Sequence, residues 1–261
     1  MNSISIPLRE DNFAEVLAGM AILGIVAGVQ ETTEDATARW TASGLNLSGL
    51  WTEEQLLAPT RAFLSSLAWL PSPGGPHLGG FQAESRLGVC PFVRLNSKDA
   101  DPSIWKTFSG QVTPIRISSW QRQAFSESSA ATSFRELLQT SADGVGSWGY
   151  DNRTTGHTLD QGFSSDAEKT GEFDPVFLVT DMLSVAALSF FLPAPALQRS
   201  EERVTYFLWT EAIPLALAPL AFCSLLNGHP GRAYQATRRP KAFGKGGAFK
   251  YWPAATLIAT A

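Results

Sequence analysis

The sequence predicts an α+β fold, in which mixed or antiparallel strands pack on apolar helices in a single compact domain. Short alternating or β-rich runs such as Ser3–Leu8 and Arg203–Thr210 are typical of strands, and longer apolar runs carry helix-start signals. The 261 residues are enough to bury a sizeable core, and no internal repeat divides them. We therefore expect one domain that contains both kinds of element.

The N-terminal elements are expected to be a strand and a buried helix. Residues Ser3–Leu8 alternate as a short strand. Asn12 followed three residues later by Glu15 is similar to a capping box and predicts a helix to about Gly28. The apolar run Val16–Val29 within it is too short to span a bilayer, so we expect a buried helix rather than a membrane anchor.

A hairpin and a second helix are expected next. The run Arg39–Gly49 is typical of two short strands joined at Ser43-Gly44. Thr52 followed by Gln55 forms a capping box, which predicts a helix over Glu53–Leu70. This helix contains Pro59, which cannot donate a ladder hydrogen bond and is expected to kink it.

The middle of the chain has weaker signals. The Pro/Gly-rich run Pro71–Gly80 predicts a loop. Strands are expected over Leu87–Leu95 and Val112–Ser118, and a helical pattern lies within Ser119–Thr140. The stretch Gly144–Gly171 has no periodicity, and long loops of this kind are usually functional or ordered by a partner.

The C-terminal part is expected to return to regular structure. Asp174-Pro175 is a strong helix start, so we expect an apolar helix to about Leu192. A strand over Arg203–Thr210 and an apolar helix over Pro214–Asn227 follow. We divide the chain into an α+β core, 1–230, and a basic, aromatic segment, 231–261, packed on the same domain.

The last fifty residues carry a strong charge asymmetry. Residues 1–211 hold 14 basic and 24 acidic side chains, a net charge of −10, whereas residues 212–261 hold 6 basic and no acidic ones. Basic side chains neutralise phosphates and aromatic rings stack on unpaired bases, so the pattern predicts contact with a polyanion. The residues expected to bind nucleic acid are Arg232, Arg238, Arg239, Lys241, Phe243, Lys245, Lys250 and Tyr251.

The same segment allows a second interpretation. A pair of strands with charges facing water and rings facing the core has the same composition. In that case the basic side chains are solvated, or dock on an acidic neighbouring subunit.

Catalytic motifs are weak in this chain. Val145–Gly149 lacks the first glycine of a nucleophile elbow, so Ser147 is not expected to be a nucleophile. No pair of carboxylates is placed for acid–base chemistry. A polar loop with spacing that fits no compact metal site carries Asp151, His157, Asp160 and Asp166. We expect no catalytic residue, no metal and no cofactor.

Cysteine and histidine usage indicates a reducing compartment. Cys90 and Cys223 are far apart, each in an apolar run, as expected of buried thiols. The three histidines lie in separate loops without metal-ligand spacing. We expect a cytoplasmic protein without membrane contact.

Four segments carry a family resemblance, and their most distinctive feature is a Gly-Phe-Ser-x-Asp loop before an apolar helix and a Trp-Thr strand. The segments are Ile4–Leu8 with Glu15–Gly24, Trp148–Arg153 leading to Asp160–Asp166, Asp174–Pro193, and Tyr206–Thr210 with Ile213–Ala218. In this order the chain resembles the Csb-type subunits of type I-U (I-G) CRISPR effector complexes, which are grouped with the Cascade large subunits.

The resemblance implies a crRNA-guided surveillance complex. In such complexes the large subunit helps to recognise the protospacer-adjacent motif, supports unwinding of target DNA and helps to recruit a helicase-nuclease. The family carries no catalytic residue over to this chain. The residues that match the family-like loop, without an assigned role, are Asp151, Arg153, Asp160, Phe163 and Asp166.

We therefore expect a non-catalytic subunit of a CRISPR interference complex that contacts other subunits and crRNA or target DNA. Two alternatives stay open. One is a structural subunit whose basic tail docks on an acidic partner. The other is a metal-dependent nuclease that uses the Asp151–Asp166 loop.

Overall fold

The computed structural model has the expected α+β fold, and the strands that pair are antiparallel. The structure describes residues 2–29, 35–72, 75–90, 105, 113–128, 130–143, 145–154, 175–192, 198–200, 202–226, 228–243 and 247–260. Its helices are α1 (Phe13–Val29), α2 (Glu53–Ser66), α3 (Pro114–Glu127), α4 (Phe134–Gln139), η1 (Asn152–Thr154), α7 (Leu178–Ala186), η2 (Ala187–Phe191), η3 (Leu215–Leu217) and α8 (Ala218–Phe222).

The strands form several small sheets. One has the order β1-β3-β2-β11, with β1 (Asn2–Ile6), β2 (Thr37–Thr41), β3 (Gly44–Gly49) and β11 (Ile213–Pro214). A meander contains β4 (Ala68–Ser72), β5 (Gly75–Ala83) and β6 (Arg86–Val89). The C-terminal sheet has the order β15-β12-β10-β9, with β9 (Gln198–Ser200), β10 (Arg203–Trp209), β12 (Gly231–Thr237) and β15 (Thr256–Thr260). Two-stranded sheets join β7 (Ser141–Ala142) to β8 (Val176–Phe177), and β13 (Arg239–Phe243) to β14 (Gly247–Tyr251).

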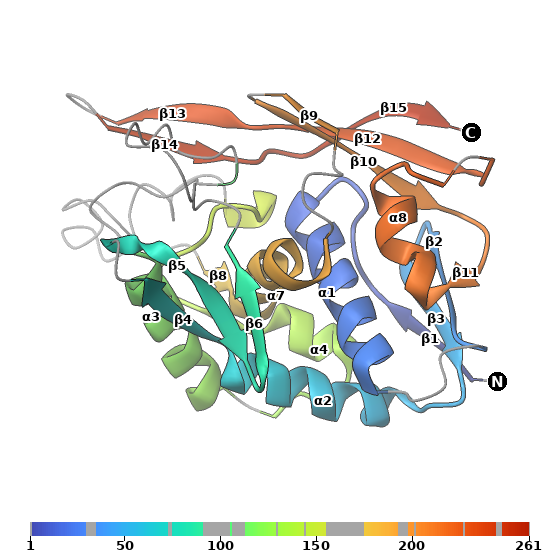
Figure 1. The fold of residues 1–261 in the computed structure, drawn as a ribbon, viewed down its shortest axis with the longest axis horizontal. Coiled ribbons are helices and arrows are strands. Elements are labelled where there is room, and N and C mark those ends of the chain that lie inside the picture. The colour runs from blue at the N-terminus through green and yellow to red at the C-terminus, as the bar shows by residue number, and fades with distance from the viewer. Residues whose placement is uncertain are drawn as a thin grey trace.

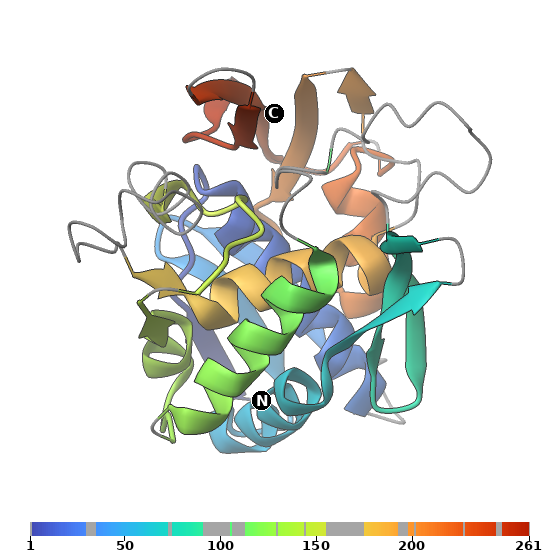
Figure 2. The ribbon, with the colours of Figure 1, turned by 90° about the vertical axis from the view of Figure 1, so that its left-hand side faces the viewer.

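Helices α1 and α7 pack against each other at the centre of the molecule (Figure 1). The sheet that contains β1, β2 and β3 lies at one end, and the β4–β6 meander lies at the other. The C-terminal strands run along one side of both helices. Figure 2 shows α3 on the outside of α7, with which it is in contact. The core is therefore continuous, and both central helices are buried on nearly all sides.

The expected start of α1 is confirmed, but its capping differs from a capping box. The Oδ1 atom of Asn12 accepts a hydrogen bond from the Ala14 N–H at 3.2 Å, as an N-cap residue does. Glu15 does not return to the Asn12 backbone. Its carboxylate instead accepts the Arg9 N–H at 2.6 Å and the Asn12 side-chain amide at 2.9 Å. Asn12 and Glu15 therefore stabilise the loop before α1 as well as the first turn of the helix.

Helix α2 begins as expected and ends earlier. Both hydrogen bonds of the Thr52–Gln55 capping box are present, but the helix stops at Ser66. The prediction of a loop over Pro71–Gly80 was wrong, because most of this run lies in β4 and β5. Its glycines allow close strand packing: a Cβ atom on Gly79 would lie 2.2 Å from the Leu70 carbonyl oxygen.

The prediction of a strand over Val112–Ser118 was also wrong, because Pro114 begins helix α3. Proline is favoured in the first turn of a helix, where its missing N–H has no partner to lose. The buried side chains Ile117, Gln121 and Phe125 recur every four residues, which is the period of one helix face. The buried polar residues Ser118 and Gln121 on the packed side of the helix obscured this pattern.

The later helices are shorter than expected. Among the described residues α7 begins at Leu178, after strand β8, and continues as a π-helical turn through Phe191. The prediction of a helix that starts at Asp174-Pro175 was wrong, because Val176 and Phe177 form strand β8 before the helix begins. The expected helix over Pro214–Asn227 consists of the short η3 and α8 only.

The basic segment is integrated into the fold. Strand β12 pairs with the core strand β10 along its whole length and with β15 on its other side. In the sequence between β12 and β15, strands β13 and β14 form a hairpin, which lies along the same side of the molecule (Figure 1).

Candidate functional site

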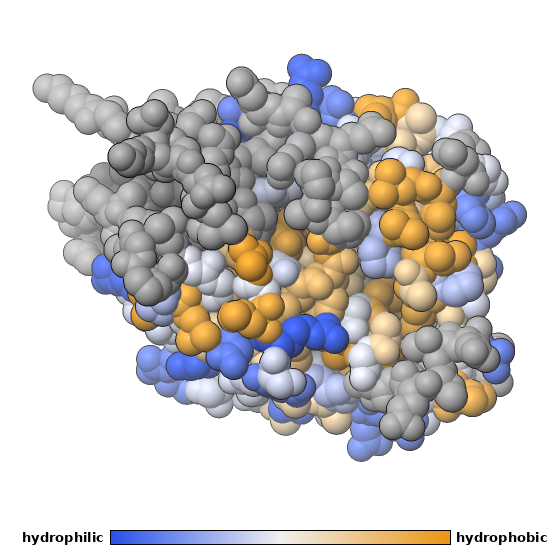
Figure 3. Space-filling view, viewed as in Figure 1, coloured by the Kyte–Doolittle hydropathy of each residue, from blue (hydrophilic) through white to orange (hydrophobic). Residues whose placement is uncertain are grey.

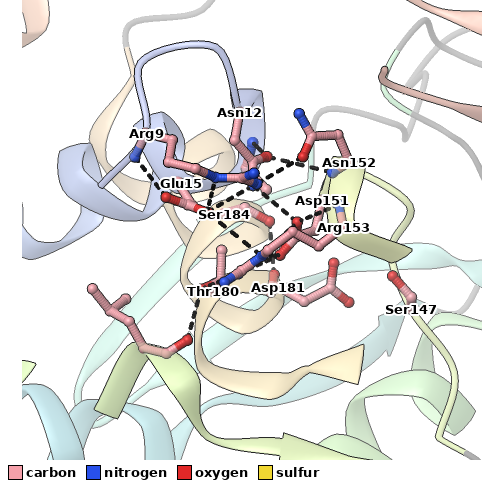
Figure 4. Close-up of polar contacts among 12 residues, drawn as sticks. Arg9, Asn12, Glu15, Ser147, Asp151, Asn152, Arg153, Thr180, Asp181 and Ser184 are labelled. Atoms are coloured by element: carbon pink, nitrogen blue, oxygen red, sulfur yellow. Dashed lines mark hydrogen bonds and ion pairs between the residues drawn. The ribbon is translucent and has the colours of Figure 1, made fainter. Parts of the chain in front are cut away.

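A buried polar network lies at the N-terminal end of α1, where this helix meets η1 and α7 (Figure 4). Its carboxylates belong to Glu15 and Asp151, which are 4% and 1% exposed. The guanidinium of Arg153 lies between them: Nη2 is 2.6 Å from Asp151 Oδ2, and Nε is 3.5 Å from Glu15 Oε1. Asn12 links the carboxylates, since its amide donates to both at 2.9 Å. The network is therefore a compensated cluster of buried charges.

Local geometry fixes the position of Arg153. The Arg153 N–H donates to Asp151 Oδ1 at 2.9 Å, the turn that an aspartate side chain forms with the backbone two residues later. Its Nη2 also donates to the Thr180 hydroxyl of α7 at 3.0 Å. The ring of Phe177 covers one face of the guanidinium, with 3.5 Å between the Arg153 Cζ and the ring centroid. The Nη1 of Arg153 makes no hydrogen bond to another described residue.

Arg9 approaches the same network from the loop before α1. Its Nε donates to Glu15 Oε1 at 2.9 Å, and its Nη2 donates to Asn152 Oδ1 at 2.8 Å. Its Nη1 has no hydrogen-bond partner among the described residues. Arg9 and Arg153, from distant parts of the chain, are thus held by buried carboxylates. The Nη1 atom of each donates no hydrogen bond to another described residue.

These two arginines and a third line a pocket of about 390 Å³. The third is Arg135 of α4, which is exposed and makes no hydrogen bond or ion pair to the part of the chain that the structure describes. The pocket joins the loop before α1, the β2–β3 turn, α4 and η1. Its lining residues are Pro7, Leu8, Arg9, Glu15, Ala42, Ser43, Arg135, Gln139 and Arg153.

A further buried carboxyl, Asp181 of α7, lies beside the network. Its Oδ2 accepts the Gln121 side-chain amide at 2.7 Å and the Trp148 N–H at 2.8 Å, whereas its Oδ1 accepts no hydrogen bond from another described residue. Burial raises the pKa of Asp181 to about 7; the two donors lower it, and the charge of Asp151 raises it. The group therefore titrates near neutral pH because of its position.

The Asp181 pKa predicts a pH-dependent stability. The folded state retains a proton that the unfolded state releases above the ordinary aspartate pKa of 3.8, so raising the pH toward 7 favours unfolding. Between pH 5 and 6.5, we expect wild type to lose about 2 kcal/mol of unfolding free energy relative to Asp181→Asn. Urea titrations of both proteins measure this difference. Equal pH dependence would contradict a raised pKa.

The structure places two of the expected nucleic-acid-binding arginines in ion pairs within the chain. Arg232 of β12 pairs with Glu10. Arg238 is 4% exposed, and its Nε lies 3.1 Å from Glu202 Oε2. Sequence alone indicated two solvent-facing cations, whereas both side chains bind carboxylates from the acidic part of the chain. They hold the tail in place, and Arg238 presents almost no surface to a ligand.

Other expected tail residues lie in the hairpin. Arg239, Lys241 and Phe243 are in β13, and Lys250 and Tyr251 are in β14. The register pairs Arg239 with Tyr251 and Lys241 with Phe249, so basic and aromatic positions face each other across the strands. Lys245 lies outside the described residues.

The hairpin is anchored at its base next to the polar network. After β14, Trp252 is fully buried, with its ring centroid 5.1 Å from that of Phe13. Its N–H donates to the Gly149 carbonyl at 3.3 Å, two residues before Asp151. The base of the hairpin and the arginine pocket thus share one end of α1.

The family-like loop is only partly described. Asp151 and Arg153 lie in the network, while Asp160, Phe163, Asp166 and His157 lie outside the described residues. Ser147 is 2% exposed, and its hydroxyl accepts the Gly149 N–H at 3.0 Å, so it supports a turn. In the described ranges no three histidine, cysteine, aspartate or glutamate side chains gather as metal ligands.

A second cavity, of about 380 Å³, is mainly apolar. It lies where α1, η2 and η3 meet, and Arg86 is the charged residue in its lining. Figure 3 shows apolar side chains gathered on this face, between β6 and α8. This cavity has one arginine in its lining, whereas the arginine pocket has three arginines and a glutamate. The arginine pocket is therefore the better candidate for binding a charged ligand.

Both cysteines lie in the core, as expected. Cys90 and Cys223 are buried, and burial raises the pKa of the Cys223 thiol to about 11. Among the described helices, none is both long and apolar enough to traverse a bilayer.

Sequence patterns did not indicate Arg9 or Arg135 as site residues. Each is a single cation in an otherwise unremarked loop or short helix, and they meet only through contacts between residues more than a hundred positions apart. Arg9 had one available signal, its position six residues before the N-terminal glutamate of α1. Comparison with known proteins found no matching family model, no matching curated protein and no matching solved structure.

Proposed function

We propose that the chain is a non-catalytic, nucleic-acid-binding subunit of a cytoplasmic crRNA-guided CRISPR interference complex. In this role it contacts guide RNA or target DNA and helps either to recognise the target or to recruit a helicase-nuclease. The observation that carries nucleic-acid binding is the basic and aromatic β13–β14 hairpin, anchored at its base by the chain's own contacts. The CRISPR context rests on the four-segment resemblance.

The hairpin has the composition that single-stranded nucleic acid requires. Lysine and arginine neutralise phosphates, and aromatic rings stack on unpaired bases without regard to sequence. Arg239 and Lys241 are each opposite an aromatic residue in the neighbouring strand. No acidic residue occurs after Glu211 to oppose a polyanion. Arg232 and Arg238 are paired within the chain, so Arg239, Lys241 and Lys250 of the hairpin are the basic residues that we propose for the ligand.

The binding test uses a triple variant, Arg239→Ala/Lys241→Ala/Lys250→Ala. We expect its affinity for a fluorescent single-stranded oligonucleotide to fall at least tenfold and the slope of log K against log salt to become shallower by about 2, at roughly 0.7 per phosphate contact. Fluorescence anisotropy at several salt concentrations measures both quantities.

The matched control removes three cations from other surfaces. Arg39, Arg116 and Arg122 are exposed and lie on β2 and α3, so their triple alanine variant has the same net charge as the hairpin variant. Its affinity should stay within about twofold of wild type. An equal loss of oligonucleotide affinity in the two variants would show that binding depends on net charge alone, and would overturn the assignment to the hairpin.

A second candidate function is a structural subunit whose tail docks on an acidic partner. It is favoured by the ion pairs of Arg232 and Arg238, which show basic tail residues binding carboxylates. Crosslinking in a purified complex separates the two functions. Links from the hairpin to nucleotides support nucleic-acid binding, and links to protein alone support docking.

A further inference from the structure

We propose that the arginine pocket binds a phosphate monoester, carried either at the end of a nucleic-acid strand or on a mononucleotide. The assignment to a strand end rests on the proposed function, whereas the assignment to a mononucleotide does not. The pocket is separate from the hairpin: its arginines come from the loop before α1, from α4 and from η1.

The geometry of the donors favours phosphate over other anions. Arg9 and Arg153 each keep an unused Nη1, and Arg135 keeps its whole guanidinium free of contacts within the described chain. A carboxylate has two oxygens to offer, whereas a terminal phosphate has three. Three arginines from three elements in the lining of one pocket suit a tetrahedral group with three such oxygens, and each arginine–phosphate pair is strengthened by charge.

The pocket favours an anion by its charge and a monoester by the number of its terminal oxygens. Three arginines and one glutamate line it, and Asp151 is ion-paired with Arg153, so these five groups carry a net charge of +1. A phosphate monoester presents three terminal oxygens, whereas an internal phosphodiester presents two. The volume of about 390 Å³ is within the range of small-molecule sites, so there is room for the attached sugar as well.

The buried carboxylates preorganise the pocket. Glu15 orients Arg9 through Nε, and Asp151 orients Arg153 through Nε and Nη2. Both guanidiniums are therefore in place before a ligand arrives, which lowers the ordering cost of binding. Buried ion pairs lose the hydration of both charges, which costs free energy. Holding the two arginines in position for a ligand would give these ion pairs a function.

Arg135→Ala is the variant that tests the pocket. Because Arg135 is exposed and unpaired among the described residues, its loss leaves the buried network intact. The probes are three single-stranded oligonucleotides of one sequence, with a phosphate at the 5′ end, at the 3′ end or at neither, together with AMP. We expect wild type to prefer at least one phosphorylated strand, or to bind AMP, with a preference that Arg135→Ala reduces about 10-fold to 100-fold.

Two controls keep this proposal distinct from the hairpin. Arg122→Ala, an exposed arginine on α3, should keep the preference. The hairpin triple variant should bind every strand more weakly by the same factor, so that the ratio between phosphorylated and unphosphorylated strands is unchanged. Loss of hairpin binding therefore does not remove the phosphate preference, and the two proposals fail independently.

The outcomes are separable. AMP binding that depends on Arg135 without a strand-end preference supports the mononucleotide and overturns the strand end. A strand-end preference that Arg135→Ala leaves unchanged overturns the assignment to this pocket. Equal affinity for all three strands, with no AMP binding, overturns the proposal.

Discussion

Replacing Arg153 with methionine should lower the free energy of unfolding by about 3–5 kcal/mol. The change removes the guanidinium between Asp151 and Glu15, both nearly inaccessible to solvent. Methionine retains an apolar chain beside the Phe177 ring, so the loss reports mainly on charge. Urea-induced unfolding followed by circular dichroism measures it.

The control for this prediction is Arg9→Met. Arg9 contacts the same Glu15, but its side chain is 49% exposed, so water replaces much of the lost interaction and we expect a cost of about 1 kcal/mol or less. Adding Asp151→Asn to Arg153→Met should recover part of the stability, because it removes the buried charge left without its cation. A loss below 1 kcal/mol in Arg153→Met alone would show that the network is not a stabilising unit.

Trp252→Ala should also cost about 3–5 kcal/mol, through a different mechanism. The indole is fully buried and packs on Phe13 and, with 6.2 Å between ring centroids, on Trp105. Alanine leaves a cavity at the base of the hairpin, so we expect weaker oligonucleotide binding in addition to lower stability. Thermal unfolding and the anisotropy assay follow the two effects in one sample.

Trp252→Phe separates packing from polarity. The indole Nε1–H has no acceptor in the part of the chain that the structure describes, so phenylalanine removes a donor that is unsatisfied there while keeping an aromatic ring. We expect a cost of no more than about 2 kcal/mol and an intact hairpin. Equal destabilisation by phenylalanine and alanine would contradict the role of ring packing.

Local chemistry explains the elements that sequence predicted. The Thr52–Gln55 capping box, the turn at Ser43-Gly44 and the strand at Arg203–Thr210 depend on residues close in sequence, and each lies where it was expected. The glycines of β5 were misread as a loop, because their function is close approach to another strand. That contact involves residues several positions away and leaves no local signature.

The candidate site was predictable only in part. Asp151 and Arg153 were identified within one loop, through the resemblance, without a role. Their partner Glu15 is 136 positions or more from both, and Arg135 joins them only when α4 packs on α7. The burial of Arg238 was unpredictable for the same reason. Its partner Glu202 comes just before β10 and lies opposite Arg238 only because β10 and β12 pair.

The loop that carries Arg9 is completed by residues from the other end of the chain. Glu10 is bound by Arg232 and Tyr234, and the Asp11 carbonyl accepts the Ala255 N–H at 2.7 Å. On the ribosome this loop is synthesised before residues 232–255, so its contacts with them form only after residue 255 has left the exit tunnel. The wall of the arginine pocket that contains Arg9 is therefore completed after translation of the β12–β15 region, not when the loop itself emerges.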